Sequence, residues 1–151
     1  MHLGEYLGKN MDILSKSEKA YFNAAKGISM LSDHRCKLGC IIVSGHRIIS
    51  SGHNSKSKFH RLQSELDNKW FPGYENKGPV HAEVAALIPL IKRRVDLSGT
   101  ALYVYRESRD GKLAMARPCP RCMELIKEQG IKKICYTTNA GYVDERIVYP
   151  N

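Results

Sequence analysis

The distribution of apolar residues predicts helices and strands that alternate along the chain. The first helix is expected to begin at Ser17, a residue type that commonly caps helix N-termini. Apolar side chains then recur at helical spacing, at Ala20, Ala24, Ile28 and Leu31. Two short extended runs follow, Leu38–Val43 and Arg47–Ser51, with a turn between them. This pattern predicts a β-hairpin.

The middle of the chain is polar. Residues 52–79 are rich in Ser, Lys, Asn, Gly and Pro. A loop of this length in a small domain is usually functional or partly structured. Three aromatic residues within it can either stack on a base or anchor the loop to the core, and we favour anchoring: Trp70, Phe71 and Tyr74.

The second half of the chain predicts a further helix over Val80–Arg94, which Pro89 is expected to kink or interrupt. Four segments follow: a strand at Thr100–Tyr105, an antiparallel return at Leu113–Ala116, a helix at Cys119–Gln129 and a final strand at Ile131–Thr138 before a short tail. The fold class expected from this order is α/β, with one mixed sheet and helices packed on its faces.

Length and composition fit one globular domain. The chain has 151 residues, of which 42% are hydrophobic and 26% charged. We expect an N-terminal lead-in at residues 1–16 and a single domain at 17–151. No apolar run approaches the roughly 18 residues of a membrane span, and the first thirty residues lack a signal-peptide pattern. Membrane and secretory roles are disfavoured, and a cytoplasmic location is expected.

The charge balance favours an anionic partner. There are 24 Lys and Arg against 15 Asp and Glu, which gives a net charge of +9. The excess is concentrated, because residues 34–64 contain no Asp or Glu. This segment is either a solvated basic face or a landing surface for the phosphate of a nucleotide or nucleic acid.

Five cysteines suggest metal or redox chemistry in a reducing compartment rather than a disulfide framework. Cys119 and Cys122 form a Cys-x-x-Cys pair where a helix is expected to begin. A zinc ribbon would need a second such pair, and Cys36 and Cys40 have the wrong spacing. A redox pair stays open, although the motif comes late in the chain for a thioredoxin-like unit.

A second motif changes the balance between these alternatives. His81-Ala82-Glu83 opens the other predicted helix of the second half. One imidazole and two thiolates, from His81, Cys119 and Cys122, leave the fourth tetrahedral position of Zn²⁺ open, as in catalytic zinc sites. Glu83 would then face that position and can move a proton between a water and a leaving group.

With these two motifs the sequence resembles the cytidine and deoxycytidylate deaminase superfamily, whose signature is H-x-E followed by P-C-x-x-C. The resemblance extends from about Ser17 to Thr138 and includes Gly52-His53-Asn54 after the hairpin. It implies a three-layer α/β/α fold with a mixed central sheet, Zn²⁺ as cofactor, Glu83 as the proton shuttle, and a homo-oligomer. It also implies that Asn54 contacts the sugar or base and that the backbone near Ala82 grips the ring.

The implied reaction is hydrolytic deamination of a cytosine nucleotide or nucleoside, such as dCMP or CMP, to the uracil form with release of ammonia. A monophosphate is expected to be preferred over the bare nucleoside, with its phosphate near Arg117 and Arg121 or the basic 34–64 segment. The alternatives are a deaminase that acts on a base in single-stranded DNA or tRNA, and a zinc-binding module without turnover. Intact Glu83 argues against the last. A charged hairpin at residues 106–117 departs from the family pattern beside the expected pocket.

Overall fold

The protein forms one mixed sheet whose strand order is β2-β1-β3-β4-β5. The structure, a computed structural model, describes residues 10–73 and 78–150, so most of the expected lead-in lies outside the described residues. Neighbouring strands are antiparallel except β3 and β4, which are parallel. The strands span Leu38–Ser44 (β1), Arg47–His53 (β2), Thr100–Arg106 (β3), Lys133–Thr138 (β4) and Gly141–Arg146 (β5).

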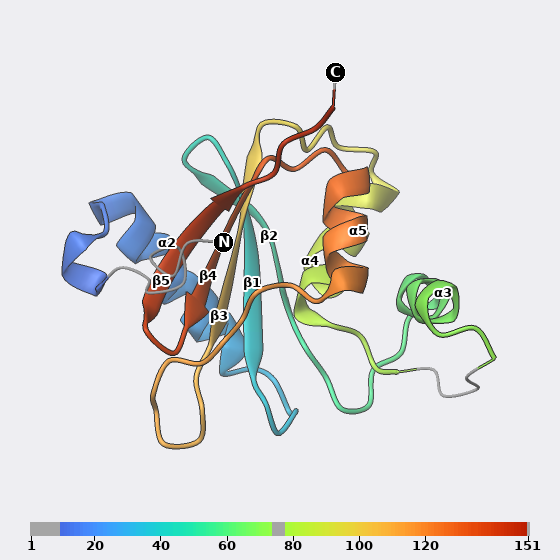
Figure 1. Cartoon of the computed structure of the whole chain (residues 1–151), viewed down its shortest axis with the longest axis horizontal. Helices are drawn as coiled ribbons and strands as arrows, with labels where there is room; N and C mark the ends of the chain where they lie inside the picture. The colour runs from blue at the N-terminus through green and yellow to red at the C-terminus, as the bar shows by residue number, and fades with distance from the viewer. Residues whose placement is uncertain (1–9, 74–77, 151) are drawn as a thin grey trace.

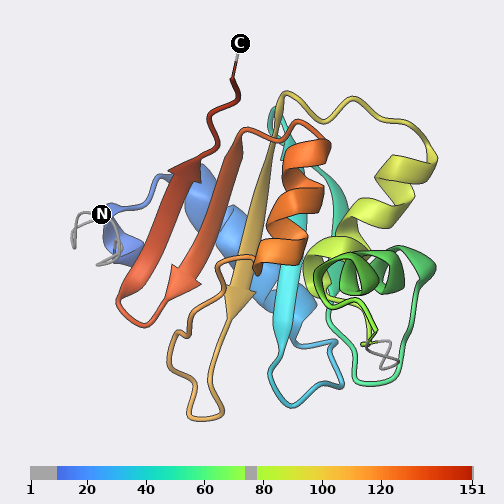
Figure 2. The same ribbon diagram turned by 45° about the vertical axis from the view of Figure 1, so that its right-hand side comes forward.

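Helices cover both faces of this sheet. Helix α2 packs on one face, whereas α4 and α5 pack on the other (Figures 1 and 2). The helical segments are η1 (Met11–Ile13), α2 (Lys16–Ser29), α3 (Arg61–Trp70), α4 (Ala82–Lys92) and α5 (Pro120–Glu128). This is the three-layer α/β/α arrangement expected from the sequence. Among the described residues, none of the helices has the length and apolar character needed to cross a bilayer.

The central strands are buried on both sides, which explains their continuous apolar runs. In β1, Ile41 belongs to the core under α2, while Cys40 and Ile42 belong to the core under α4 and α5. Helix α4 also lies directly on β2. A Cβ at Gly52 would overlap the backbone of Ala86, so only glycine allows this close approach.

The predicted start of the first helix and the predicted interruption at Pro89 need correction. Helix α2 is capped by Ser15 rather than Ser17. The Ser15 hydroxyl accepts a hydrogen bond from the Glu18 amide, and the Glu18 carboxylate accepts one from the Ser15 amide, which forms a capping box. Helix α4 continues through Pro89 to Lys92. Pro89 lies in the last turn of α4, where the helix loses one amide donor and then ends.

Helix α3 and strand β5 were not predicted from the sequence. Helix α3 lies inside the segment expected to be a loop, because its pattern is largely polar and two of its three buried side chains are Gln63 and Asp67. Strand β5 follows β4, so the prediction that β4 is the last strand was wrong. Three of its six residues are charged, which suits an edge strand but hides the alternation. The expected return at Leu113–Ala116 is a single antiparallel bridge between Glu107 and Leu113.

Candidate metal centre and active-site cavity

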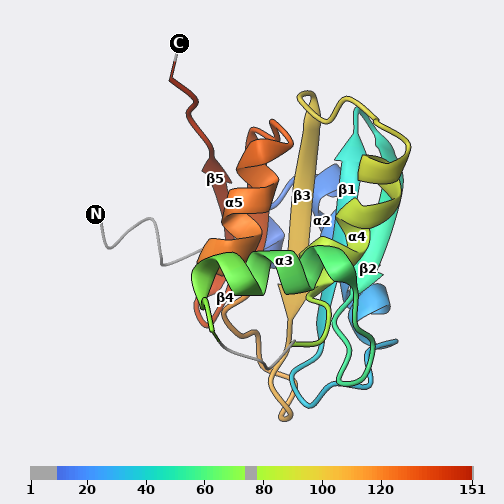
Figure 3. The same cartoon turned by 90° about the vertical axis from the view of Figure 1, so that its right-hand side faces the viewer.

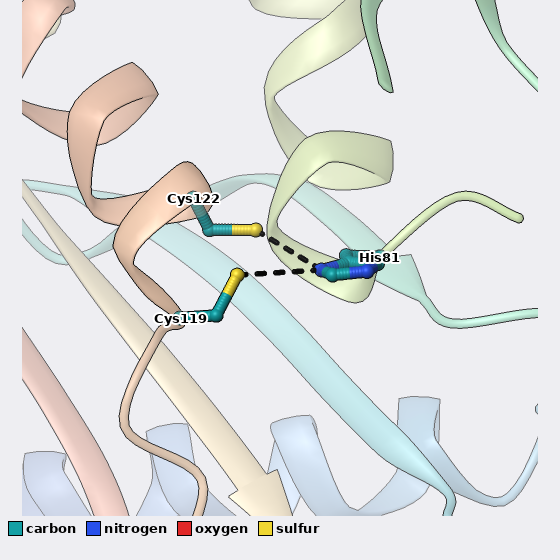
Figure 4. A group of neighbouring side chains, drawn as sticks. All are labelled: His81, Cys119 and Cys122. Atoms are coloured by element: carbon teal, nitrogen blue, oxygen red, sulfur yellow. Dashed lines mark hydrogen bonds between the residues drawn. The ribbon is translucent and has the colours of Figure 1, made fainter. Parts of the chain in front are cut away.

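The two sequence motifs meet at the N-termini of α4 and α5. His81 is the N-cap residue of α4, and Cys119 is the N-cap residue of α5. Pro120 occupies the first turn of α5, where its missing amide hydrogen costs no helical hydrogen bond. Figure 4 shows the three side chains converging, with the sulfurs of Cys122 and Cys119 at 3.3 and 3.7 Å from Nδ1 of His81.

These three donors fit a tetrahedral zinc ion. One nitrogen and two sulfurs, one atom from each residue, lie within 4.8 Å of one another. Ideal zinc bonds of roughly 2.05 Å to nitrogen and 2.3 Å to sulfur place the two donor types about 3.6 Å apart at a tetrahedral angle. The two observed nitrogen-to-sulfur distances bracket this value. Among the described residues, His81, Cys119 and Cys122 are the group that can hold a metal ion.

The electrostatics of the group favour a metal-binding thiolate. Hydrogen bonding from Cys122, and then from His81, lowers the pKa of the Cys119 thiol to about 3. The hydrogen bond with Cys119 also raises the pKa of His81. By contrast, the neighbouring Cys119 and burial raise the pKa of Cys122. Two adjacent thiolates are thus disfavoured without a cation, and Zn²⁺ is a cation that would compensate both.

Glu83 is a buried carboxyl beside this group. It lies in the first turn of α4 and is 4% exposed. Burial raises its pKa above the ordinary value, so its protonated form is easier to reach than that of an exposed glutamate. A cavity of about 420 Å³ opens in front of it, and its wall includes His81, Ala82, Glu83 and Cys119. This volume lies in the range of pockets that hold small molecules.

Asn54 lines the same cavity and also ties together the loop before β1. Its Oδ1 accepts hydrogen bonds from the Leu38 amide at 2.9 Å and from the Ser32 hydroxyl at 2.6 Å. Its Nδ2 donates to the carbonyl oxygen of Cys36 at 2.5 Å. The side chain is 8% exposed, so these bonds fix its orientation. One of the two amide hydrogens has no acceptor among the described residues.

The two arginines expected near the phosphate differ in position. Arg117 lines the cavity and forms two hydrogen bonds with Glu145, at 3.0 and 2.8 Å. Arg121 is absent from the cavity wall. Its Nη1 donates to Asp67 at 2.6 Å, and its guanidinium lies 5.3 Å from the centre of the Phe71 ring. Lys56, Lys58 and Arg61 do not contribute to this wall either, but Arg106 does.

Helix α3 supports the metal-binding group from outside. In Figure 3 it lies across the N-terminal ends of α4 and α5. The fully buried Gln63 accepts a hydrogen bond from the His81 amide at 3.1 Å and donates to Asp67 at 3.0 Å. Asp67 in turn pairs with Arg121, two residues after Cys119. Gln63 and Asp67 were not predicted, because only a short apolar stripe, Leu62 and Leu66, marks the helix that carries them in an otherwise polar segment.

The aromatic residues at the end of α3 contact α5. Trp70 donates from Nε1 to Glu124 at 2.9 Å, and Phe71 lies under Arg121. Both contacts hold the end of α3 against α5, but Trp70 and Phe71 are about half exposed and do not reach the core, so the expected anchoring to the core is wrong for these two residues. Tyr74 lies outside the described residues.

Comparisons with known proteins agree with this site. The chain is 28% identical over 130 residues to the deoxycytidylate deaminase of Mycobacterium phage D29, a match that covers 79% of this chain and 92% of the relative. It is 25% identical over 97 residues to the deoxycytidylate deaminases of Enterobacteria phages T2 and T4, which covers 63% of this chain. The match spans 44% and 43% of the length of these two relatives.

Solved structures show the same fold. The dCMP deaminase of cyanophage S-TIM5, in complex with dCMP and dUMP, aligns with a TM-score of 0.58 and 29% identity over 82% of each chain. The cytidine deaminase of Burkholderia pseudomallei aligns with a TM-score of 0.61 over 88% of this chain and 93% of that chain, at 16% identity. The family model of the cytidine and deoxycytidylate deaminase zinc-binding region matches residues 15–138. The chain therefore belongs to the cytidine and deoxycytidylate deaminase family.

Proposed function

We propose that this protein is a zinc-dependent hydrolase that deaminates the cytosine base of a small nucleotide, with deoxycytidine monophosphate as the preferred substrate. The observation that carries the proposal is the convergence of His81, Cys119 and Cys122 beside the buried Glu83, at the wall of a nucleotide-sized cavity. The phage relatives named deoxycytidylate deaminase, and the cyanophage enzyme in complex with dCMP and dUMP, support the choice of substrate.

The overall reaction exchanges one amino group for one oxygen. Water adds to the ring carbon that bears the amino group, the carbon–nitrogen bond breaks, and the products are the uracil nucleotide and ammonia. When bound by His81, Cys119 and Cys122, zinc supplies Lewis-acid activation of the water. The two cysteines and the histidine leave one coordination position for this purpose.

Glu83 carries the protons in this proposal. Its carboxylate accepts a proton from the attacking water, and the resulting carboxylic acid donates a proton toward the departing amino group. Its raised pKa suits both roles, because the protonated state costs less free energy than it would at an exposed glutamate.

The remaining wall residues orient the nucleotide. We assign to Asn54 a hydrogen bond to the sugar or base from its unused amide hydrogen, and to the backbone at Ala82 a contact with the ring. Arg117 has three N–H groups beyond the two that Glu145 accepts, and these can bind the 5′-phosphate. Because Arg121 is paired with Asp67 and lies outside the cavity wall, Arg117 and Arg106 are the better candidates for this contact.

A substrate panel tests the proposal. Ammonia release is measured with cytosine, cytidine, deoxycytidine, CMP, dCMP, dCTP, guanine, adenosine, single-stranded DNA and tRNA. We expect dCMP to give the highest kcat/KM, about ten- to a hundredfold above deoxycytidine, since a charge-assisted contact to phosphate contributes about 1.5–3 kcal/mol. Activity confined to the polynucleotides would overturn the small-nucleotide assignment. A preference for uncharged nucleosides would overturn the role of the phosphate.

A further inference from the structure

One hollow adjoins the active-site cavity, and a second hollow adjoins the first. The first, of about 410 Å³, shares Cys36 and Arg106 with the active-site cavity. The second, of about 320 Å³, shares Arg35 and Arg109 with the first. They lie between the loop after α2 and the turn after β3. These two segments extend side by side from the same end of the sheet (Figures 1 and 2). We refer to the lining of these two hollows as the outer shelf.

The outer shelf carries four cations: Arg35, Lys37, Arg106 and Arg109. Among the described residues, none of the four is in an ion pair. Arg106 links the shelf to the active-site cavity, and its Nη1 donates to the carbonyl oxygen of Met115 at 3.2 Å. Its Nε is buried without a hydrogen-bond partner. A buried donor that lacks an acceptor is costly, and no acid among the described residues offsets the positive charge of this guanidinium.

The carboxylates on the shelf do not neutralise these cations. Glu107 forms an ion pair with Lys26 at 3.3 Å and accepts a hydrogen bond from the Tyr105 hydroxyl. Asp110 accepts hydrogen bonds from Ser108 and the Lys112 amide, and pairs with the Lys112 ammonium at 3.8 Å. Lys26 and Lys112 lie outside the lining, and they offset the two acids. The shelf therefore keeps the charge of its four unpaired cations.

Backbone hydrogen bonds hold the two segments that present Arg35 and Arg109. The Cys36 amide donates to His34 at 2.9 Å, and the Cys36 carbonyl accepts from Asn54. Arg109 lies in a tight turn in which the Ser108 amide donates to the Lys112 carbonyl at 2.8 Å. Gly111 has φ +81° there, which favours glycine. These bonds fix the backbone at both arginines, whose side chains are exposed.

We propose that the outer shelf is a second phosphate subsite, which binds a phosphate beyond the one attached to the reacting nucleotide. The inference rests on the proposed function, because it places the first phosphate in the active-site cavity. Two ligand sources offer this chemistry: the β-phosphate of a nucleoside diphosphate, and the phosphate of the preceding nucleotide in a strand. In the diphosphate one anhydride oxygen links the second phosphate to the first, whereas in the strand a nucleoside separates the two phosphates. Arg106 lines both cavities and so lies between the two proposed positions.

The binding of product nucleotides tests the subsite without turnover. Dissociation constants of the whole protein are measured calorimetrically for dUMP, dUDP and the dinucleotide 5′-phosphothymidylyl-deoxyuridine, at low salt. We expect at least one of the two longer ligands to bind about tenfold more tightly than dUMP. A gain for dUDP alone identifies the diphosphate, and a gain for the dinucleotide alone identifies a strand. Equal affinity for all three ligands would overturn the subsite.

A charge-removing variant localises the effect. The double substitution Arg35→Ala and Arg109→Ala is expected to abolish the gain and to leave dUMP affinity within about twofold, because these residues lie outside the active-site cavity. Arg47→Ala is the matched control. Arg47 is exposed and pairs with Ser44 at the end of β1 away from the site. A gain that survives the double substitution would overturn the assignment.

Failure of this inference is distinguishable from failure of the proposed function. Deamination of dCMP is measured separately, on the same preparation. Turnover of dCMP together with equal affinities of the three products would refute the subsite and retain the deaminase. A tighter second-phosphate ligand without turnover would retain the subsite and refute the deaminase.

Discussion

Two helices of opposite character, α4 and α3, lie beside the metal-binding group. Helix α4 begins at the site, and apart from Glu83 all of its buried side chains are apolar. Helix α3 lies beside it and buries Gln63 and Asp67 together with one leucine. Both helices contact the metal-binding group at His81: it caps α4, and Gln63 of α3 accepts a hydrogen bond from its amide. The first carries His81 and Glu83, the proposed ligand and proton carrier, and the second forms hydrogen bonds with His81 and Arg121.

The two helices therefore contribute differently: α4 carries residues proposed to take part in the reaction, and α3 carries residues that hold the neighbouring side chains in place. The proposed ligands can be predicted from short motifs in the sequence, because His81 and Cys119 are each the N-cap residue of a helix. The apolar face of each helix packs against the sheet. The support depends on contacts between distant residues. Gln63 reaches His81 across 18 positions, and Asp67 reaches Arg121 across 54. Substitutions in the two regions are therefore expected to differ in kind as well as in size.

The largest effect is expected from the cysteine ligands. Cys119→Ser or Cys122→Ser should lower zinc content to less than about a tenth, abolish deamination, and lower the melting temperature, because metal binding is coupled to folding. Elemental analysis and thermal denaturation measure these quantities. Cys36→Ser is the matched control for zinc content, since Cys36 lies outside the metal-binding group. Full zinc occupancy in both ligand variants would refute the assignment.

The next effect separates zinc binding from proton transfer. Glu83→Gln should keep zinc and the fold but reduce kcat for dCMP by about 10²- to 10⁴-fold, since a positioned general acid–base contributes about that much. Steady-state kinetics and metal analysis of the same sample test this. Near-normal turnover would remove Glu83 from the mechanism.

A smaller effect is expected from α3. Gln63→Leu removes the acceptor of the His81 amide hydrogen, and it should weaken zinc affinity about 10- to 100-fold, as outer-shell substitutions do. A competition titration with a chromophoric chelator measures the affinity. Gln129→Leu, at the opposite end of α5, is the control. If Gln63→Leu lowers the melting temperature and leaves zinc affinity unchanged, α3 has a packing role alone.

The smallest effect is expected from breaking the Arg117–Glu145 ion pair at the partly exposed wall of the cavity. Arg117 holds the pKa of Glu145 below its ordinary value. The ion pair therefore stabilises the fold above about pH 4.5 and loses its effect as pH falls through the lower pKa of the folded state. Glu145→Gln should cost less than about 1 kcal/mol at pH 7 and less again at pH 3. Urea unfolding at both pH values tests this, and a larger cost at pH 3 would contradict it.

The same division shows what the sequence can and cannot predict. The hairpin of β1 and β2 follows from two apolar runs and a turn, and the zinc ligands follow from two motifs at helix starts. Helix α3 was harder to find in this way, because its apolar stripe is short, Leu62 and Leu66, and its other buried residues, Gln63 and Asp67, are polar and contact α4 and α5. The pairing of Arg117 with Glu145 was equally hidden, since it requires the position of β5.

Removal and return of zinc test the central claim most directly. Wild-type protein is assayed for zinc and for dCMP deamination before chelation, after chelation, and after zinc is added back. We predict about one zinc ion per chain, loss of deamination in the metal-free protein, and recovery in proportion to the zinc restored. Full turnover of dCMP by protein shown to contain no zinc would contradict the account.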